Sequence, residues 1–349
     1  MTDIRYQPSA LQDFACRALT ERGLTPAMAE TVAAALLEAD LLGHHTHGLI
    51  LLGDYLEEIE NGDMIVTGEP TVLADHAAVA TWDARRLPGL WTTSRAITEA
   101  TRRAEKFGTG AVALRRSHHI GCLASFLEAP ARQGYIVLIF SSDPSDAHVA
   151  PYGAVTPVLT PNPIAAAIPA EPDPVLIDVS TSITTAAMCG RARRNGTPLA
   201  GQWLLGPDGK ATDNAAGFGQ GATILPIGGV DHGHKGYALS FLVEALSQGL
   251  SGFGRRDEPH QWGAAVLVMA LAPGAFGPVR DFLAQSSFLA DACRAAKPVP
   301  GGKPVRLPGE AGLERKRRAL AEGLALPAHI AASLKDVAEK LKLSPPPAR

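Results

Sequence analysis

Residues 111–140 read AVALRRSHHIGCLASFLEAPARQGYIVLIF, and this stretch decides the fold class. It holds two apolar runs of strand length, at 111–114 and 135–140, on either side of a segment at 122–133 with helical spacing. A strand, a helix and a second strand at this spacing are typical of a crossover unit, whose two strands run in the same direction. We therefore expect an α/β protein whose sheet is partly parallel.

Toward the N-terminus, the first 60 residues have the spacing of helices rather than of strands. Thr25 followed by Pro26 predicts the start of a helix that ends at Gly43, since threonine favours the N-cap, proline the first turn and glycine the C-terminal end. A further helix is expected to begin at Thr46, with Thr46 as its cap and His47 in its first turn.

The composition is that of a chain with a sizeable core. Of 349 residues, 46% are hydrophobic and 19% are charged, which excludes a disordered chain. Lys plus Arg is 32 and Asp plus Glu is 35, so the net charge of −3 gives no sign of a nucleic-acid or membrane-surface partner. The four scattered cysteines exclude a disulfide framework and a zinc ribbon, and the lack of an apolar leader near Met1 predicts a cytoplasmic protein.

The histidines form groups in glycine-flanked loops, where binding and catalytic residues often lie. Histidine suits proton transfer near neutral pH, so these groups are candidates for acid–base catalysis. Two alternatives stay open: solvated loop side chains, or ligands of a catalytic metal, although no H-E-x-x-H motif accompanies them. The groups are His44, His45 and His47; His118 and His119; and His232 and His234.

Common nucleotide-binding and hydrolase motifs are missing. The glycine-rich segment GFGQG at 217–221 lacks the full dinucleotide fingerprint and follows no clear strand, so a Rossmann unit is not indicated. Neither a Walker A loop nor a G-x-S-x-G turn is present.

Seven short segments, spread in order over most of the chain, carry a more specific signal. They are ADLLG through THG to NGD within 39–63, RSHHIG at 116–121, PNPIA at 161–165, DVSTS at 178–182, LPIGG at 225–229, HKGY at 234–237 and LPGE at 307–310. Together they resemble the malate/L-lactate dehydrogenase family, whose members bind NAD(P) on a mixed sheet that is not a Rossmann fold. One such motif would be weak, whereas seven in the order of the family are specific.

The resemblance implies an architecture and partners. Residues 1–66 and 300–349 would form a helical domain from both termini. Residues 67–299 would form a non-Rossmann NAD(P)-binding domain around a mixed sheet, with a helical insertion near 230–261. The family further implies NAD or NADP as the cofactor, a homodimer with the site near the subunit interface, a small-molecule substrate and no bound metal.

The resemblance also assigns roles to individual residues. His47 and His119 match histidines with acid–base roles, and which of them is the proton donor stays open. Thr46 and Leu51 fall on the substrate side, and the charge of Lys235 would meet the cofactor pyrophosphate. The matches to cofactor-binding positions are Pro174, Ile177, Asp178, Val179 and Ser180, then His234 and Lys235, and finally Gly309 and Glu310.

The substrate side departs from the family pattern. Leu51 stands where family members commonly carry an arginine that can pair with a substrate carboxylate, and residues 141–144 read SSDP where an asparagine is frequent. Arg115 and Arg116 are the nearest candidates to replace that cation. A buried carboxylate without a charged partner is costly, so small acids such as oxaloacetate are expected to be poor substrates, and bulkier or cyclic compounds better ones.

These observations predict an NAD(P)-dependent oxidoreductase that acts on a small 2-oxo or 2-hydroxy acid or a cyclic imino acid. The reaction would be hydride transfer, with a histidine as acid and base. One alternative is a catalytically inactive relative that binds a dinucleotide or a metabolite. Another is a metalloenzyme built on the histidine groups.

Overall fold

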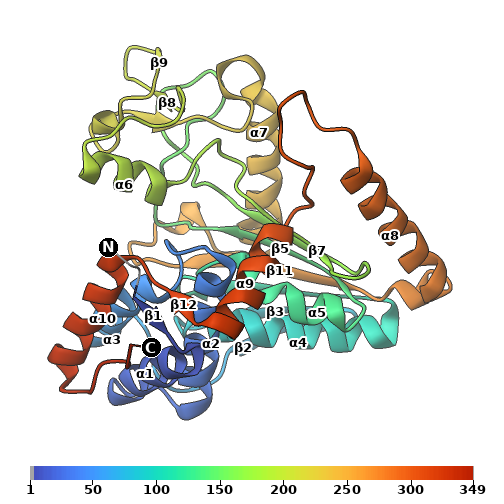
Figure 1. Ribbon diagram of the computed structural model, residues 1–349, viewed down its shortest axis with the longest axis horizontal. Helices are drawn as coiled ribbons and strands as arrows, with labels where there is room; N and C mark the ends of the chain where they lie inside the picture. The colour runs from blue at the N-terminus through green and yellow to red at the C-terminus, as the bar shows by residue number, and fades with distance from the viewer. Residues whose placement is uncertain (1–3, 349) are drawn as a thin grey trace.

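The computed structural model describes residues 4–348 and has a seven-stranded sheet at its centre (Figure 1). The strand order is β2-β3-β4-β11-β5-β6-β7, and β3–β4 is the parallel pair among antiparallel neighbours. The prediction of an α/β protein with a mixed sheet is confirmed. The strands are β2 (Thr71–His76), β3 (Val79–Asp83), β4 (Thr109–Ser117), β5 (Ile136–Ser142), β6 (Ile164–Ile168), β7 (Val175–Val179) and β11 (Ala264–Leu271).

Residues 111–140 supply two strands of this sheet, β4 and β5, which point the same way but are not neighbours. Strand β11 lies between them and runs antiparallel to both, so that Val266 is opposite Leu114 on one side and Ser141 on the other. The parallel pairing is instead β3–β4, and its crossover is helix α4 (Gly89–Phe107). Strand β11 takes the central place because it is apolar and largely buried along its length.

The first two helices lie within the region predicted to be helical, and the second begins and ends at the predicted residues. They are α1 (Pro8–Glu21) and α2 (Pro26–Leu42); the Thr25 hydroxyl accepts the Met28 N–H, and Gly43 ends α2 with φ 90°. The third predicted helix is present, but its predicted start at Thr46 was wrong. Thr46 and His47 lie in a turn, and the chain continues as a 3₁₀ turn, η1 (Leu49–Leu51), and then α3 (Leu52–Glu60).

Both termini join one core. Strand β1 (Arg5–Tyr6) pairs with β12 (Leu324–Ala325), and α9 (Glu310–Glu322) and α10 (Ala328–Leu341) pack with the N-terminal helices. This core continues without a break into the sheet through α4 and β4. The terminal helices and the sheet therefore share buried apolar contacts, and the predicted boundaries between domains remain predictions.

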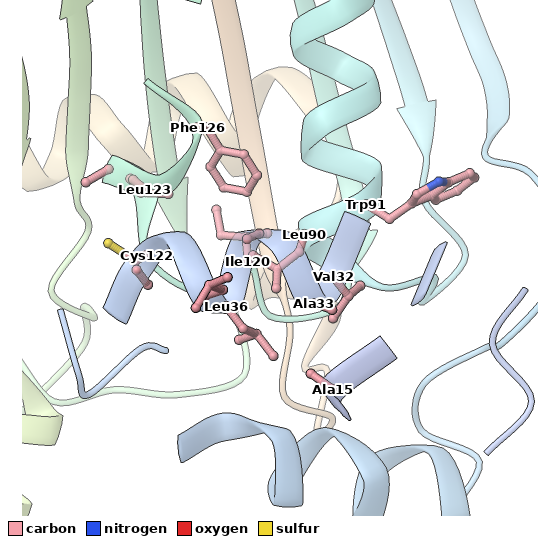
Figure 2. Close-up of a cluster of buried hydrophobic side chains, with 14 of the residues drawn as sticks. Ala15, Val32, Ala33, Leu36, Leu90, Trp91, Ile120, Cys122, Leu123 and Phe126 are labelled. Carbon is pink, nitrogen blue, oxygen red and sulfur yellow. The ribbon is translucent and has the colours of Figure 1, made fainter. Parts of the chain in front are cut away.

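Helices cover the two faces of the sheet. Apolar side chains of α2 and α4 pack on one face, where α5 (Glu128–Arg132) also lies; Figure 2 shows part of this cluster around Leu36, Leu90 and Ile120. Val243 of α7 (Gly229–Glu244) packs on the other face against Phe140 and Leu267. A π-helical turn, η4 (Ala245–Gly249), continues α7.

The remaining elements lie at the sheet's periphery. Helix α6 (Ala186–Asn195) packs with a three-stranded sheet of β8 (Leu204–Leu205), β9 (Ala211–Thr212) and β10 (Thr223–Ile224) around a small core of its own. Helix α8 (Val279–Ala295) stands apart from the body in Figure 1, and Ala290 is its one buried residue. Within residues 4–348, no helix combines the length and the apolar character that crossing a membrane demands. The 3₁₀ turns are η2 (Leu123–Phe126), η3 (Ala215–Gly217), η5 (Arg255–Asp257) and η6 (Pro273–Ala275).

Candidate active site

A cavity of about 570 Å³ lies where several strand ends and loops meet. Its walls come from the loop after α2, the loops after β4 and β5, the end of β7, the start of α6 and the residues before β11. Polar and aromatic side chains in its wall include His44, Thr46, His47, His119, Ser141, Ser142, Asp143, Asp146, His148, Asp178, Ser180 and Trp262. The fold therefore brings two of the three predicted histidine groups into one cavity.

His47 and His119 face each other there. Their ring centroids are 6.0 Å apart, and the His119 ring stacks on Trp262 at 4.2 Å. The loop that carries His119 is held from below, because Ile120 is buried in the core beside Leu90 (Figure 2). The two predicted catalytic histidines thus share one site.

Hydrogen bonds fix the tautomer of His119. Its Nδ1 lies 2.9 Å from the Tyr55 hydroxyl and accepts the Gly121 N–H at 3.4 Å. Because a backbone N–H can only donate, Nδ1 is an acceptor and the ring proton is on Nε2. Tyr55 is fully buried, and burial raises its pKa, so its hydroxyl stays protonated and donates to Nδ1 as well.

The two histidines differ in charge preference. Burial, together with the neighbouring His47 and His118, holds the pKa of His119 well below its ordinary value, so His119 is neutral. Burial also lowers the pKa of His47, but the carboxylate of Asp178 acts in the opposite direction. His47 is therefore the easier of the two to protonate.

A buried aspartate organises the His47 loop. Asp40 is 1% exposed; its Oδ2 accepts the Leu49 N–H at 2.7 Å, and its Oδ1 lies 2.7 Å from His45 Nδ1. A Cβ at Gly48 would lie 2.3 Å from Asp40 Oδ2, so this position needs glycine. Because these bonds hold the chain in a turn, Thr46 cannot cap a helix; its hydroxyl lies 2.8 Å from His47 Nδ1 instead.

Among the predicted cofactor residues, Asp178 and Ser180 line the cavity. Oδ2 of Asp178 accepts the Ala124 N–H at 2.8 Å, which ties the end of β7 to the loop below the histidines. Pro174, Ile177 and Val179 lie along the same segment but outside the cavity wall.

The other predicted cofactor residues also lie around β7 but outside the cavity. A Cβ at Gly309 would meet Leu176 at 2.6 Å, and Glu310 accepts the Leu307 N–H at 2.8 Å. His234 and Lys235 are exposed near the start of α7, which packs through Gly236 against the backbone of Thr181 and Ile227. Gly309 thus packs on β7 itself, whereas the start of α7 packs against residues that follow β7.

The predicted substrate side is only partly at the cavity. Thr46 lines it, whereas Leu51 packs against the apolar core and is not part of the wall. Arg115 and Arg116 both pair with the buried Asp83, at 3.0 and 2.6 Å, so neither replaces the missing arginine. Sequence reasoning missed Tyr55, Trp262 and Asp143, since nothing local to each marks its distant partners.

The cavity fits a nicotinamide dinucleotide. Its wall includes Ala186 and Ala187 at the N-terminus of α6, which the Thr185 side chain caps by accepting the Met188 N–H. Free backbone N–H groups at a helix N-terminus attract phosphate, and Asp178 and Ser180 offer polar groups suited to ribose hydroxyls. Residues 4–348 hold no group of three or more His, Cys, Asp or Glu side chains arranged for a metal ion.

Comparisons with known proteins agree with this site. The sequence model of the malate/L-lactate dehydrogenase family matches residues 6–335. Malate dehydrogenase of Pyrococcus abyssi is 28% identical over 97% of this chain and 95% of its own. Delta(1)-pyrroline-2-carboxylate reductase of Ancylobacter novellus is 30% identical over 91% and 93%. The structure of malate dehydrogenase from Pyrococcus horikoshii OT3 superposes with a TM-score of 0.88 at 26% identity, covering 98% of this chain and 97% of that one.

The chain therefore belongs to the malate/L-lactate dehydrogenase family. It is an NAD(P)-dependent oxidoreductase, as the resemblance of its seven motifs predicts.

Proposed function

We propose that this enzyme interconverts a small 2-oxo and 2-hydroxy acid, or a cyclic imino acid and its reduced form. The observation that carries the proposal is that His47 and His119 face each other in one cavity. His119 is uncharged, and its ring proton is on Nε2. Bound nicotinamide supplies or accepts the hydride. The histidines supply hydrogen bonding and proton exchange at the reacting oxygen or nitrogen.

The two histidines take different parts in this proposal. Neutral His119 cannot give up its Nε2 proton without becoming an anion, so it acts as a hydrogen-bond donor that polarises the carbonyl or imine. His47, whose protonated form Asp178 favours, exchanges the proton: it gives one to the oxygen in reduction and takes one from the hydroxyl in oxidation.

The cofactor is proposed to lie near the end of β7, within reach of the three predicted segments. Asp178 and Ser180 would meet the ribose, the start of α6 would meet phosphate, and Lys235 would add a positive charge. The mixed sheet would then be a non-Rossmann NAD(P)-binding domain over 67–299, and the termini a helical domain. NAD and NADP both fit this description.

The same proposal includes a homodimer. Exposed apolar side chains gather on α7 and α8, where Phe241, Phe288 and Leu289 are 66%, 71% and 64% exposed. Apolar surface of this kind is typical of a subunit interface. A reaction that draws on the NAD(P) pool also favours the cytoplasm as its location.

The test is a set of 2-oxo acids and cyclic imines offered to the purified enzyme with NADH or NADPH. Loss of the reduced-cofactor absorbance with at least one compound is expected. A catalytically inactive relative would bind the cofactor and turn over none of them. Activity that follows the content of a bound metal would favour the metalloenzyme instead.

A further inference from the structure

The cavity has an unusual charge for an enzyme of small acids. Its wall, as far as residues 4–348 form it, contains three aspartates, Asp143, Asp146 and Asp178, and neither lysine nor arginine. A 2-oxo or 2-hydroxy acid with a second acid group would bring two negative charges into this space. Like charges within several ångströms of each other oppose binding strongly in a partly buried site.

The arginines near the cavity are committed elsewhere. The Arg255 guanidinium pairs with Glu244 at 2.9 Å and donates to the backbone oxygens of Asp143 and Asp146 rather than to their carboxylates. Arg86 donates to the backbone oxygens of Asp63 and Trp262. Arg115 and Arg116 are held by Asp83, so each of these four arginines already has a partner within residues 4–348.

Asp143 lines the same cavity as His47 and His119. It follows the end of β5, where Ser142 pairs with Ala265, and Ala264 on the same strand pairs with Ser117 before His118. The loops that carry His119 and Asp143 therefore follow the ends of β4 and β5, at the same end of the sheet, with β11 between the two strands. That separation is about 10 Å between backbones, which leaves room for a small substrate between the side chains.

One oxygen of Asp143 is available to a ligand. Its Oδ1 accepts the Ser145 N–H at 2.8 Å and the Ser145 hydroxyl at 2.6 Å, and its Oδ2 accepts no hydrogen bond from residues 4–348. Asp146, by contrast, already pairs with His148 at 2.7 Å. Burial raises the pKa of Asp143, although the hydrogen bonds from Ser145 and the charge of Arg255 act in the opposite direction.

We propose that the substrate carries a positively charged nitrogen, an ammonium group or a protonated ring nitrogen, which pairs with Asp143. This inference rests on the hydride transfer of the proposed function, to a carbonyl or an imine, and concerns the charge of the group beside the reacting carbon. Asp143 is then the residue that determines specificity, and doubly negative acids are rejected. Leu51, in place of the arginine common in the family, fits a site that does not select for an additional acid group.

The test measures kcat/KM of the whole enzyme, with its preferred reduced cofactor, for three ketones of nearly equal size. Aminoacetone carries an ammonium group, hydroxyacetone a hydroxyl group and pyruvate a carboxylate; 1-piperideine and oxaloacetate extend the series at both ends. We expect kcat/KM for aminoacetone to exceed that for hydroxyacetone by at least about tenfold and that for pyruvate by about 100-fold. Titration calorimetry of the same ketones into the enzyme–NADP⁺ complex, where no reduction occurs, should give the same order of affinity.

Variants assign the preference to a residue. Asp143→Asn should bring kcat/KM for aminoacetone to within about threefold of that for hydroxyacetone, because only the charge is removed. Asp213→Asn, the same change at an exposed position outside the cavity, should keep the wild-type preference. A thermal melt of each variant shows whether it is folded, and the order of the ketones with the wild-type enzyme tests the proposal even if Asp143→Asn does not fold.

The outcomes separate the two proposals. Pyruvate or oxaloacetate used better than the nitrogen compounds, or a loss in Asp143→Asn that is equal for charged and neutral ketones, would overturn the inference and leave the oxidoreductase intact. If the enzyme bound no cofactor and turned over none of the compounds, both proposals would be overturned.

Discussion

His119 and His47 show how single residues divide the chemistry. Replacement of His119 by Ala removes the Nε2 donor, so kcat should fall by about 10²–10³-fold while the cofactor dissociation constant stays within about twofold. His119→Gln, which retains an N–H donor, should recover part of this loss.

His47→Ala should remove the pH dependence that the proton-exchanging group imposes on kcat. Near wild-type turnover in both alanine variants would contradict these assignments.

Tyr55 acts on the reaction through His119. Its hydroxyl is one of two donors that keep Nδ1 unprotonated, and Tyr55→Phe leaves the Gly121 N–H as the other, at 3.4 Å. We expect kcat to fall by about tenfold with little change in KM, because the population with the proton on Nε2 decreases. The matched control is Tyr152→Phe, since Tyr152 donates to the Val230 carbonyl at the surface. An equal loss in both variants would show that Tyr55 serves packing alone.

His118 ties the stability of the protein to pH. It is fully buried; its Nε2 lies 3.0 Å from a Glu58 oxygen, and its Nδ1 has no partner within residues 4–348. Protonation would place an unsatisfied N–H in the core. Burial, aided by the Arg86 charge, thus lowers the pKa of His118 to about 3.

In the unfolded chain His118 titrates near the ordinary histidine pKa of about 6.5. Between about pH 6.5 and pH 3 the unfolded chain therefore binds a proton that the native chain does not. Stability contributed by His118 is therefore complete above about pH 6.5 and decreases as the pH falls. At about pH 5 the loss should be about 2 kcal/mol. Urea unfolding at about pH 7.5 and pH 5 should give a smaller difference for His118→Gln than for the wild type. An unchanged difference would count against this account.

At the scale of elements, helix α4 sets the position of the catalytic loop. Its first residue, Gly89, packs so closely that a Cβ there would lie 2.1 Å from the His118 carbonyl oxygen and 2.4 Å from that of His119. Gly89→Ala must therefore shift the helix or the loop. We expect about 2 kcal/mol or more of lost stability, together with a lower kcat.

Gly53 provides the control for this change. It lies in α3, where a Cβ would come no closer than 3.9 Å to Val337. Gly53→Ala should be neutral or should stabilise the protein by up to about 1 kcal/mol, since alanine favours the helix. Thermal unfolding and steady-state kinetics of both variants check the prediction, and equal behaviour would refute it.

For the whole molecule, the exposed apolar residues of α7 and α8 predict assembly. Phe288→Glu with Leu289→Glu places two charges on this surface, so sedimentation velocity should show a monomer for the variant and the proposed dimer for the wild type. Leu320→Glu is the control, because Leu320 is exposed on α9. A dimer that survives the double change would place the interface elsewhere.

The sequence by itself determined what depends on near neighbours and on composition. Thr25 and Gly43 set the limits of α2 because caps act within a few residues, and apolar runs such as 135–140 became strands because their length and periodicity suit a buried sheet. The seven short motifs, those around His47 and His119 among them, were sufficient to indicate the family and the reaction class. Their order along the chain carried information that no single motif had.

Only the tertiary structure decided which distant residues meet. Strand β11 lies between β4 and β5 although it is far from both in sequence. Any apolar strand of the chain can pair with any other, so the pairing depends on the whole fold. Asp83 holds Arg115 and Arg116 away from the cavity, Asp40 keeps Thr46 out of a helix, and Tyr55 fixes the His119 tautomer. The contacts of Asp83 and Tyr55 join residues more than 30 positions apart, and that of Asp40 closes a nine-residue loop. The geometry of such contacts depends on the packing of several elements at once, so no local pattern records it.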